Sequence, residues 1–124
     1  MKTILKGIIL FVQDTDKLKS FYTDNFNFEV IEEIKSEWVL LNAGGFELGL
    51  HKSNQHLVSS EKSSCENSNA KIVLEIDEDI FSIRELLLKK NTALREIKTF
   101  ENYDYWLCDG EDPEGNVFQI KQKK

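Results

Sequence analysis

The sequence has few of the residues that mark specialised classes of protein. Its 124 residues include two cysteines, one proline and two histidines. Cys65 and Cys108 are too few for a disulfide framework, and we expect both thiols to be free, as intracellular redox conditions favour. His51 and His56 lie five residues apart and do not form a zinc motif without further ligands. The sequence therefore offers neither a disulfide scaffold nor a zinc motif.

Long apolar runs and an excess of basic residues are also missing. No run approaches the roughly 18 apolar residues of a membrane span, and Lys6 interrupts the N-terminal segment before a signal peptide could form. The formal net charge is −6, whereas a nucleic-acid surface needs a basic face. We therefore predict a globular cytoplasmic protein that binds neither a membrane nor nucleic acid.

The first half of the chain contains one helix among four strands. Residues 7–13 form an apolar run that is too short for a helix and ends at Asp14, which predicts a buried strand. Asp14 supplies an N-cap, and apolar residues at helical spacing predict a helix over residues 16–25. Three more strands are expected at residues 28–34, 37–42 and 46–51.

The second half repeats this order. Residues 71–76 predict a strand, Asp77-Glu78-Asp79 a helix start, and the spacing of Ile80, Ile83 and Leu87 a helix. Strands are then expected at residues 93–98, 103–108 and 117–121. The repeat rests on the pattern of elements, because the two halves share few identical residues.

A tight turn is predicted just before the last strand, at residues 112–116. Pro113 fixes φ at its first corner, and Gly115 or Asn116 can take the left-handed conformation that the turn needs. Between the halves, residues 53–69 are rich in serine and asparagine and are typical of a solvated connector. We predict a single domain over residues 1–124, with module one at about 1–52 and module two at about 70–124.

Taken together, these segments resemble the vicinal oxygen chelate superfamily of glyoxalases, bleomycin resistance proteins and extradiol dioxygenases. The matching pieces are residues 9–16, 21–22, 25–28, 44–48 and 112–120, and the resemblance covers nearly the whole chain apart from the connector. It implies an α+β fold of two βαβββ modules whose curved sheets form a cup. It also implies a homodimer, because members commonly pair and sometimes exchange modules.

The resemblance also implies where a metal would bind. In metal-dependent members, side chains from the first and last strands of both modules hold a divalent ion that acts as a Lewis acid. Carried over, the four positions are Gly7, Gly49, Lys71 and Gln119, with Glu47 replacing Gly49 if the strand slips by two residues. Glycine has no donor atom, and a protonated lysine has no lone pair. We therefore predict no metal and no other cofactor.

Strand alternation predicts which side chains line the cup. Gly7 and Phe11 share one face of their strand, Lys71 and Glu75 share one face of theirs, and His51 is expected to face away. The predicted ligand-binding residues are Phe11, Trp38, Glu47, Lys71, Glu75 and Gln119. An alternative for Lys71 is a structural bridge to Glu47 or Glu75. An alternative for Trp38 is packing in the core or at a dimer interface.

Three functions remain open. The first, which we favour, is a metal-free protein of the glyoxalase/bleomycin-resistance type that sequesters or senses a small organic molecule. The second is a lyase or isomerase that uses Glu47, Glu75 or Lys71 as an acid or base. The third is an interaction module whose cup is filled by its own side chains. No residue can be assigned as catalytic, and the ligand cannot be named, because function resides in the site rather than in the fold.

Overall fold

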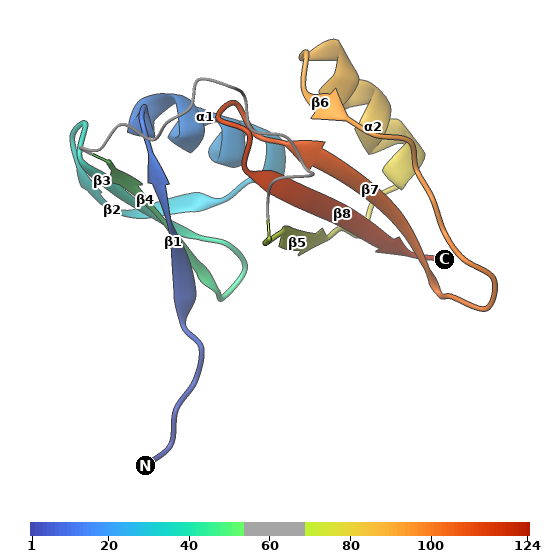
Figure 1. Cartoon of the computed structure of the whole chain (residues 1–124), viewed down its shortest axis with the longest axis horizontal. Helices are drawn as coiled ribbons and strands as arrows, with labels where there is room; N and C mark the ends of the chain where they lie inside the picture. Colours follow the sequence, from blue (N-terminus) through green and yellow to red (C-terminus); the bar gives the residue numbers. More distant parts are fainter. Residues whose placement is uncertain (54–68) are drawn as a thin grey trace. The chain divides into compact units, whose positions relative to one another are not determined.

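A computed structural model describes residues 1–53 and 69–124. The chain divides into two compact units, Met1–Val58 and Ser59–Lys124, and each holds a four-stranded sheet and one helix (Figure 1). The order of elements confirms the predicted α+β fold with two βαβββ modules. Most of the predicted connector lies outside the described residues, as do His56 and Cys65.

The first unit has its helix between the first and second strands. Its elements are β1 (Gly7–Val12), α1 (Thr15–Phe26), β2 (Glu29–Ile34), β3 (Trp38–Asn42) and β4 (Glu47–Lys52). Asp14 caps the helix by accepting the backbone N–H of Lys17 at 3.0 Å, and Asn27 ends it with φ of 59°. The strand order is β1-β4-β3-β2, so the first strand lies beside the last and runs parallel to it.

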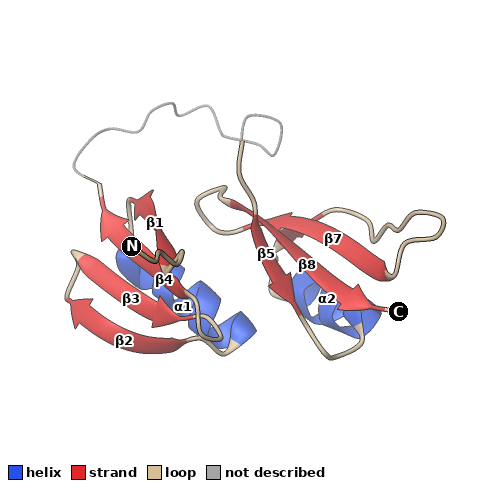
Figure 2. Ribbon diagram, turned by 90° about the horizontal axis from the view of Figure 1, so that it is seen from below, coloured by secondary structure: helices blue, strands red, loops and turns tan. Residues whose placement is uncertain are grey.

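Helix α1 covers one face of the first sheet, and the described residues of this unit place no helix on the other face (Figure 2). Leu18 and Tyr22 of the helix are fully buried. The strands contribute the buried apolar side chains of Val12, Val39, Leu41, Leu48 and Leu50 to the same core. We call the other side the open face of the first sheet; strand register places on it Gly7, Ile9, Phe11, Trp38, Leu40, Asn42, Glu47, Gly49 and His51.

The second unit repeats the topology. Its elements are β5 (Ile72–Glu75), α2 (Ile80–Lys89), β6 (Ala93–Leu94), β7 (Tyr105–Glu111) and β8 (Val117–Lys123). The strand order is β5-β8-β7-β6, again with the first strand parallel to the last. Two predicted strands have other bounds in the structure. The strand expected at residues 103–108 begins at Tyr105 and runs on to Glu111.

The strand predicted at residues 93–98 is much shorter, because its ladder is interrupted. Arg95 donates its backbone N–H to the carbonyl of Asp109, and Lys98 donates to that of Leu107, both on β7. From Arg95 to Lys98 the chain advances three residues, whereas β7 advances only two residues between Asp109 and Leu107, so this segment contains one extra residue. An extra residue of this kind breaks regular pairing. Only Ala93–Leu94 remains a strand, with an isolated bridge from Lys98 to Leu107.

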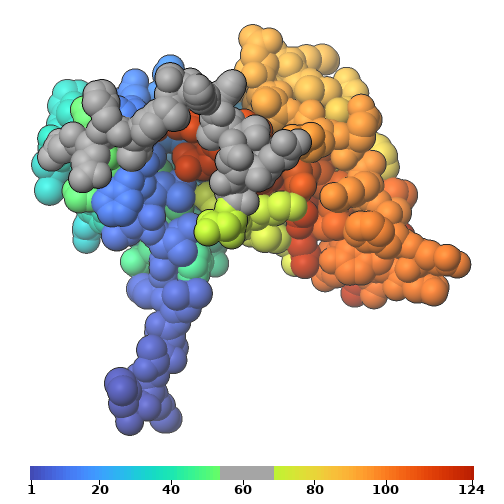
Figure 3. All heavy atoms as spheres, in the orientation of Figure 1, coloured from blue at the N-terminus to red at the C-terminus, as the bar shows by residue number. Residues whose placement is uncertain are grey.

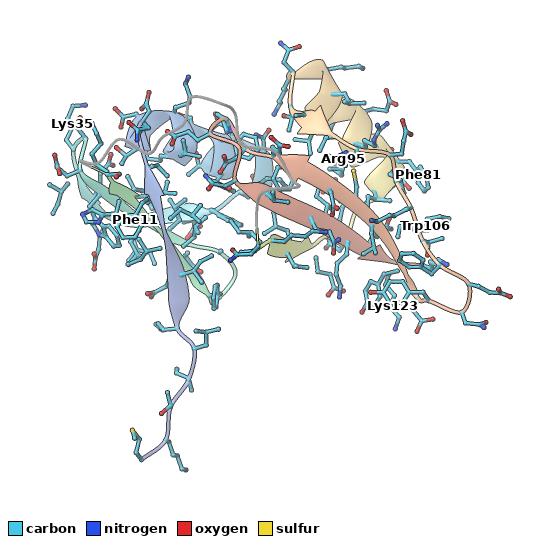
Figure 4. The ribbon with its side chains drawn as sticks, in the orientation of Figure 1. Phe11, Lys35, Phe81, Arg95, Trp106 and Lys123 are labelled. Carbon is cyan, nitrogen blue, oxygen red and sulfur yellow. The ribbon has the colours of Figure 1, made fainter. Side chains whose placement is uncertain are left out.

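Helix α2 packs on one face of the second sheet. Cys108, Phe118 and Ile120 are fully buried on this side, and Phe81 of the helix contacts the ring of Trp106 at a centroid distance of 5.2 Å (Figure 4). The backbone N–H of Ile80 also donates to Gln122 Oε1 of β8 at 2.8 Å. The opposite side is the open face of the second sheet; it carries Lys71, Val73, Glu75, Tyr105, Leu107, Asp109, Val117, Gln119 and Lys121.

The predicted turn sets the register of β7 against β8. Gly115 takes the left-handed conformation with φ of 84°. Asp112 is buried, and its Oδ1 accepts the backbone N–H groups of Glu114 and Asn116 at 2.9 and 3.0 Å. Because the hairpin is centred on Glu114, residues equally far from it along the two strands are paired.

The first six residues extend away from β1 (Figure 3). Ile4 and Leu5 are 78% and 77% exposed. The carbonyl of Lys6 accepts the backbone N–H of Glu47 at 3.0 Å, which fixes the point where the extended segment joins the sheet. Among the described residues, no helix is both long enough and apolar enough to cross a membrane.

Candidate functional site

Gly7 leaves no room for a side chain. A Cβ atom built at this position would clash with the backbone carbonyl oxygen of Glu47 and would lie 2.9 Å from the Cβ of the same residue. Gly7 and Glu47 are partners in the parallel pairing of β1 with β4, so the obstacle is backbone and cannot rotate away. The first position implied for a metal ligand therefore has no donor atom. The backbone of Glu47 also leaves no space for a side chain that could supply one.

The second implied position is covered by an aromatic ring. A Cβ atom at Gly49 would lie 2.6 Å from Cη2 of Trp38 and 3.1 Å from Cγ1 of Ile9. Glu47, the alternative at this position, has its Oε2 3.7 Å from Nζ of Lys6. The lysine is 65% exposed, so the pairing is weak.

Three aromatic side chains lie together on the open face of the first sheet. The ring of His51 lies 5.6 Å from that of Phe11 and 5.8 Å from that of Trp38. The indole N–H of Trp38 donates to Glu32 Oε1 at 3.0 Å, and Phe11 is 60% exposed (Figure 4). We call Phe11, Trp38 and His51 the aromatic group.

The prediction that His51 faces away from this side is wrong. Side chains alternate with a period of two along a strand, so residues 47, 49 and 51 share one face. The register agrees, because Phe11 and Trp38 are both paired with His51. His51 therefore belongs to the same face as Glu47 and Gly49.

On the second sheet, Asp109 joins two of the predicted site residues. Its Oδ2 lies 2.9 Å from Nζ of Lys71, and its Oδ1 accepts Nε2 of Gln119 at 2.9 Å. Only 11% of the Asp109 side chain is exposed, against 42% for Lys71. We call these residues the Lys71–Asp109–Gln119 group. The alternative of a bridge from Lys71 to Glu75 is wrong, and Glu47 pairs with Lys6 of its own unit.

Sequence reasoning missed Asp109 because the predicted strand stopped at Cys108. The signal was present in the hairpin. Asp109 and Gln119 stand five residues on either side of Glu114, so a turn centred there pairs them across the two strands. Asp109 also follows the apolar run of residues 105–108 directly. A carboxylate in such a strand is seldom buried unless it is paired, so a partner could have been expected.

The surroundings of Asp109 hold it in the charged form. Burial raises the pKa of its carboxyl, but hydrogen bonds from Lys71 and Gln119, with the charges of Lys71 and Lys98, outweigh that effect. The pKa of Asp109 therefore lies below its ordinary value. The charged carboxylate only accepts hydrogen bonds, so Gln119 must turn its amide nitrogen toward Asp109.

Other residues of this open face differ in exposure, and Leu107 and Val117 are buried. Glu75 is exposed at the end of β5, and Val73 is 55% exposed. Nζ of Lys121 lies 4.1 Å from the centre of the Tyr105 ring, a cation–π contact. The second unit thus places a fixed polar group beside apolar and aromatic surface.

The residues at the implied metal positions do not fit a divalent ion. Gly7 is closed by backbone, Gly49 lies under Trp38, and Lys71 brings a positive charge that is paired with Asp109. Within residues 1–53 and 69–124, no group of three or more His, Cys, Asp or Glu side chains could hold a metal ion. These positions therefore do not supply the ligand set that a divalent metal needs.

The sequence matches the family profile described as Glyoxalase/Bleomycin resistance protein/Dioxygenase superfamily over residues 4–120. The chain belongs to this superfamily. The resemblance drawn from the sequence segments is thus confirmed. No curated protein has a sequence that matches this chain.

Solved structures of this superfamily share the fold at low sequence identity. The fosfomycin resistance protein FosX from Listeria monocytogenes, complexed with Mn(II) and a sulfate ion, is 17% identical with a TM-score of 0.80, covering 100% of this chain and 93% of its own. FosX from Mesorhizobium loti is 14% identical with a TM-score of 0.73, covering 100% and 94%. Lactoylglutathione lyase from Agrobacterium tumefaciens is 14% identical with a TM-score of 0.69, covering 98% and 94%. At these identities the likeness concerns the fold alone.

Proposed function

We propose that this superfamily member is a small-molecule-binding protein that sequesters or senses its ligand without a resident divalent metal. The observation that carries the proposal is the Lys71–Asp109–Gln119 group. At two positions where the superfamily resemblance implies metal ligands, the chain has an ammonium and an amide, both hydrogen-bonded to the carboxylate of Asp109 on β7. The ammonium supplies a fixed positive charge where a cation would otherwise be held.

The make-up of the two open faces supports ligand binding. Small-molecule sites are mostly apolar or aromatic and contain a few well-placed polar groups. The second sheet offers the Lys71–Asp109–Gln119 group beside the exposed Val73, and the first sheet offers the aromatic group. The proposed contacts remain Phe11, Trp38 and Glu47 on the first sheet, and Lys71, Glu75 and Gln119 on the second.

A lyase or isomerase is the second candidate, and the geometry supports it less well. General acid–base catalysis is most efficient when the pKa of the catalytic group lies near the working pH. Asp109, the buried carboxylate beside Lys71, has a pKa below its ordinary value and is therefore a weak base. Lys71 is engaged in an ion pair with Asp109.

Elemental analysis and a ligand screen test the proposal together. The protein is purified without chelator, and we expect Mn, Fe, Ni and Zn to be well below one equivalent per chain. A thermal-shift screen of amphipathic antibiotics and metabolites should then find compounds that raise Tm, because ligands that bind only the folded state stabilise it. The same metals, added alone, should not raise Tm.

Each unfavourable outcome has a distinct meaning. One tightly bound equivalent of metal would overturn the metal-free part of the proposal. A screen in which no compound raises Tm would overturn ligand binding and favour an interaction module. Mass spectrometry of the stabilising compounds after incubation separates a binder from an enzyme, because conversion to a product would favour the lyase or isomerase.

A further inference from the structure

The Lys71–Asp109–Gln119 group holds two side chains in a fixed relation. The two oxygens of one carboxylate each receive one donor, Nζ of Lys71 and Nε2 of Gln119, both at 2.9 Å. Gln119 is paired in the sheet with Asp109 on one side and with Val73 on the other. The ammonium and the amide therefore stand next to each other on the open face of the second sheet.

Two kinds of group remain for a ligand: the acceptor Oε1 of Gln119 and the N–H groups of Lys71 that Asp109 does not use. With its nitrogen on Asp109, Gln119 directs the Oε1 atom elsewhere, and no described residue donates to it. An ammonium has three N–H groups, and Asp109 takes one from Lys71, which leaves two. Lys71 is 42% exposed at its side chain, so a molecule from solvent can reach it.

A molecule that matches this arrangement carries an acceptor next to a donor. A primary or cyclic amide has both, since its C=O can accept from Lys71 while its N–H donates to Gln119 Oε1. The charges of Lys71 and Asp109 offset each other, so the ligand needs no charge of its own. Exposed Val73, paired with Gln119 in the sheet, offers apolar surface for the rest of the molecule.

We propose that the Lys71–Asp109–Gln119 group selects uncharged carboxamides or lactams, with Asp109 as the positioning residue that fixes the donor and the acceptor. The proposal rests on the proposed function of the chain as a small-molecule-binding protein. Asp109 acts through its neighbours and contacts no ligand itself. Without it, the Gln119 amide can turn either end outward and Lys71 loses its anchor.

The test uses benzamide and two analogues as probes, with binding followed by NMR titration of the ¹⁵N-labelled full chain. N,N-dimethylbenzamide lacks the N–H donor, and benzoate lacks the donor and carries a negative charge. We expect benzamide to bind about threefold to tenfold more tightly than N,N-dimethylbenzamide. This ratio of dissociation constants corresponds to the free energy of one hydrogen bond. Benzoate should bind no more tightly than benzamide.

Three substitutions and one control show which residues cause the preference for benzamide over N,N-dimethylbenzamide. Gln119→Met removes the acceptor at similar volume, so the preference for benzamide over N,N-dimethylbenzamide should disappear. Lys71→Met should weaken both probes about tenfold. Lys121→Met removes a lysine from the same face and should leave the preference unchanged. Asp109→Asn should reduce the preference for benzamide, whereas a purely structural role would leave this preference unchanged in the folded variant.

The outcomes separate this proposal from the proposed function. If other compounds raise Tm but benzamide does not bind, or binds no better than N,N-dimethylbenzamide, the amide preference is overturned and small-molecule binding stands. A preference that persists in Gln119→Met, or tighter binding of benzoate, also overturns it. If neither the probes nor any compound of the screen binds, the proposed function itself is overturned. Circular dichroism checks the fold of each variant, and Gln119→Leu replaces Gln119→Met if the latter does not fold.

Discussion

Asp109 is a buried carboxylate that fixes the positions of two other side chains. A charge removed from water is costly unless it is paired and hydrogen-bonded, and Asp109 meets both conditions through Lys71 and Gln119. The same contacts hold those two side chains in place on the open face. Stability and the arrangement of the candidate site therefore depend on one residue.

The lowered pKa of Asp109 predicts how the free energy of unfolding changes at acid pH. Because its pKa is lowered in the folded state, Asp109 contributes stability that is complete above the unfolded pKa of about 3.9 and is lost as pH falls through the folded value. We expect Asp109→Asn to lower the free energy of unfolding most near neutral pH. The difference from the parent should shrink below about pH 4. Urea denaturation at a series of pH values measures it, with the exposed Glu75→Gln as the control for loss of one negative charge.

A difference between parent and Asp109→Asn that stays constant with pH would contradict this assignment. It would mean that the variant loses packing or geometry rather than a charge interaction. A Glu75→Gln variant with the same pH profile would also contradict it, because the effect would then belong to net charge.

At the residue scale, local sequence patterns predicted the positions but not the partners. Gly7, Lys71 and Gln119 could be assigned to one side of their strands because alternation is a local property. The bond between Lys71 and Asp109 spans 38 residues of sequence, and no local pattern encodes it. His51 was misplaced for a different reason, since correct counting along its own strand puts it on the face of Gly49.

At the scale of elements, the signals that succeeded were caps, turns and periodicity. Asp14 and Asp79 cap the two helices through local hydrogen bonds, and Gly115 makes the turn between β7 and β8. The failure at residues 93–98 arose from pairing with β7, where an extra residue interrupts the ladder. Register depends on the partner strand, so the sequence of one strand does not reveal it.

The pairing of β1 with β4 gives a prediction about two glycines. We expect Gly7→Ala to lower the free energy of unfolding by about 1–3 kcal/mol or more, because the new methyl meets the backbone of Glu47. Gly49→Ala should cost less, because the atoms in the way belong to the side chains of Trp38 and Ile9. Urea denaturation of both variants measures the difference.

A second substitution separates the two kinds of obstacle. Trp38→Phe removes the part of the ring that lies over Gly49, so it should relieve Gly49→Ala and leave the cost of Gly7→Ala unchanged. Equal costs for the two alanine variants, or relief of Gly7→Ala by Trp38→Phe, would contradict this account.

At the scale of the whole molecule, we predict a homodimer. Each sheet has two edge strands, β1 and β2 in the first unit and β5 and β6 in the second. Several apolar side chains are exposed on β1 and β2, including Ile9, Phe11, Val30, Ile31 and Ile34. Open edges and apolar surface of this kind are usually covered by association. Light scattering should give twice the chain mass, and a monomer at high micromolar concentration would contradict the prediction.

The closed position at Gly7 also bears on how this chain could change over evolutionary time. A single codon change can place a carboxylate at Lys71 or Gln119, but at Gly7 any such side chain meets the carbonyl of Glu47. The parallel strands β1 and β4 would have to move apart first, and that movement alone would lower stability without supplying a ligand set. A metal site that uses this strand therefore requires coupled changes, so no single substitution at the implied positions can complete one.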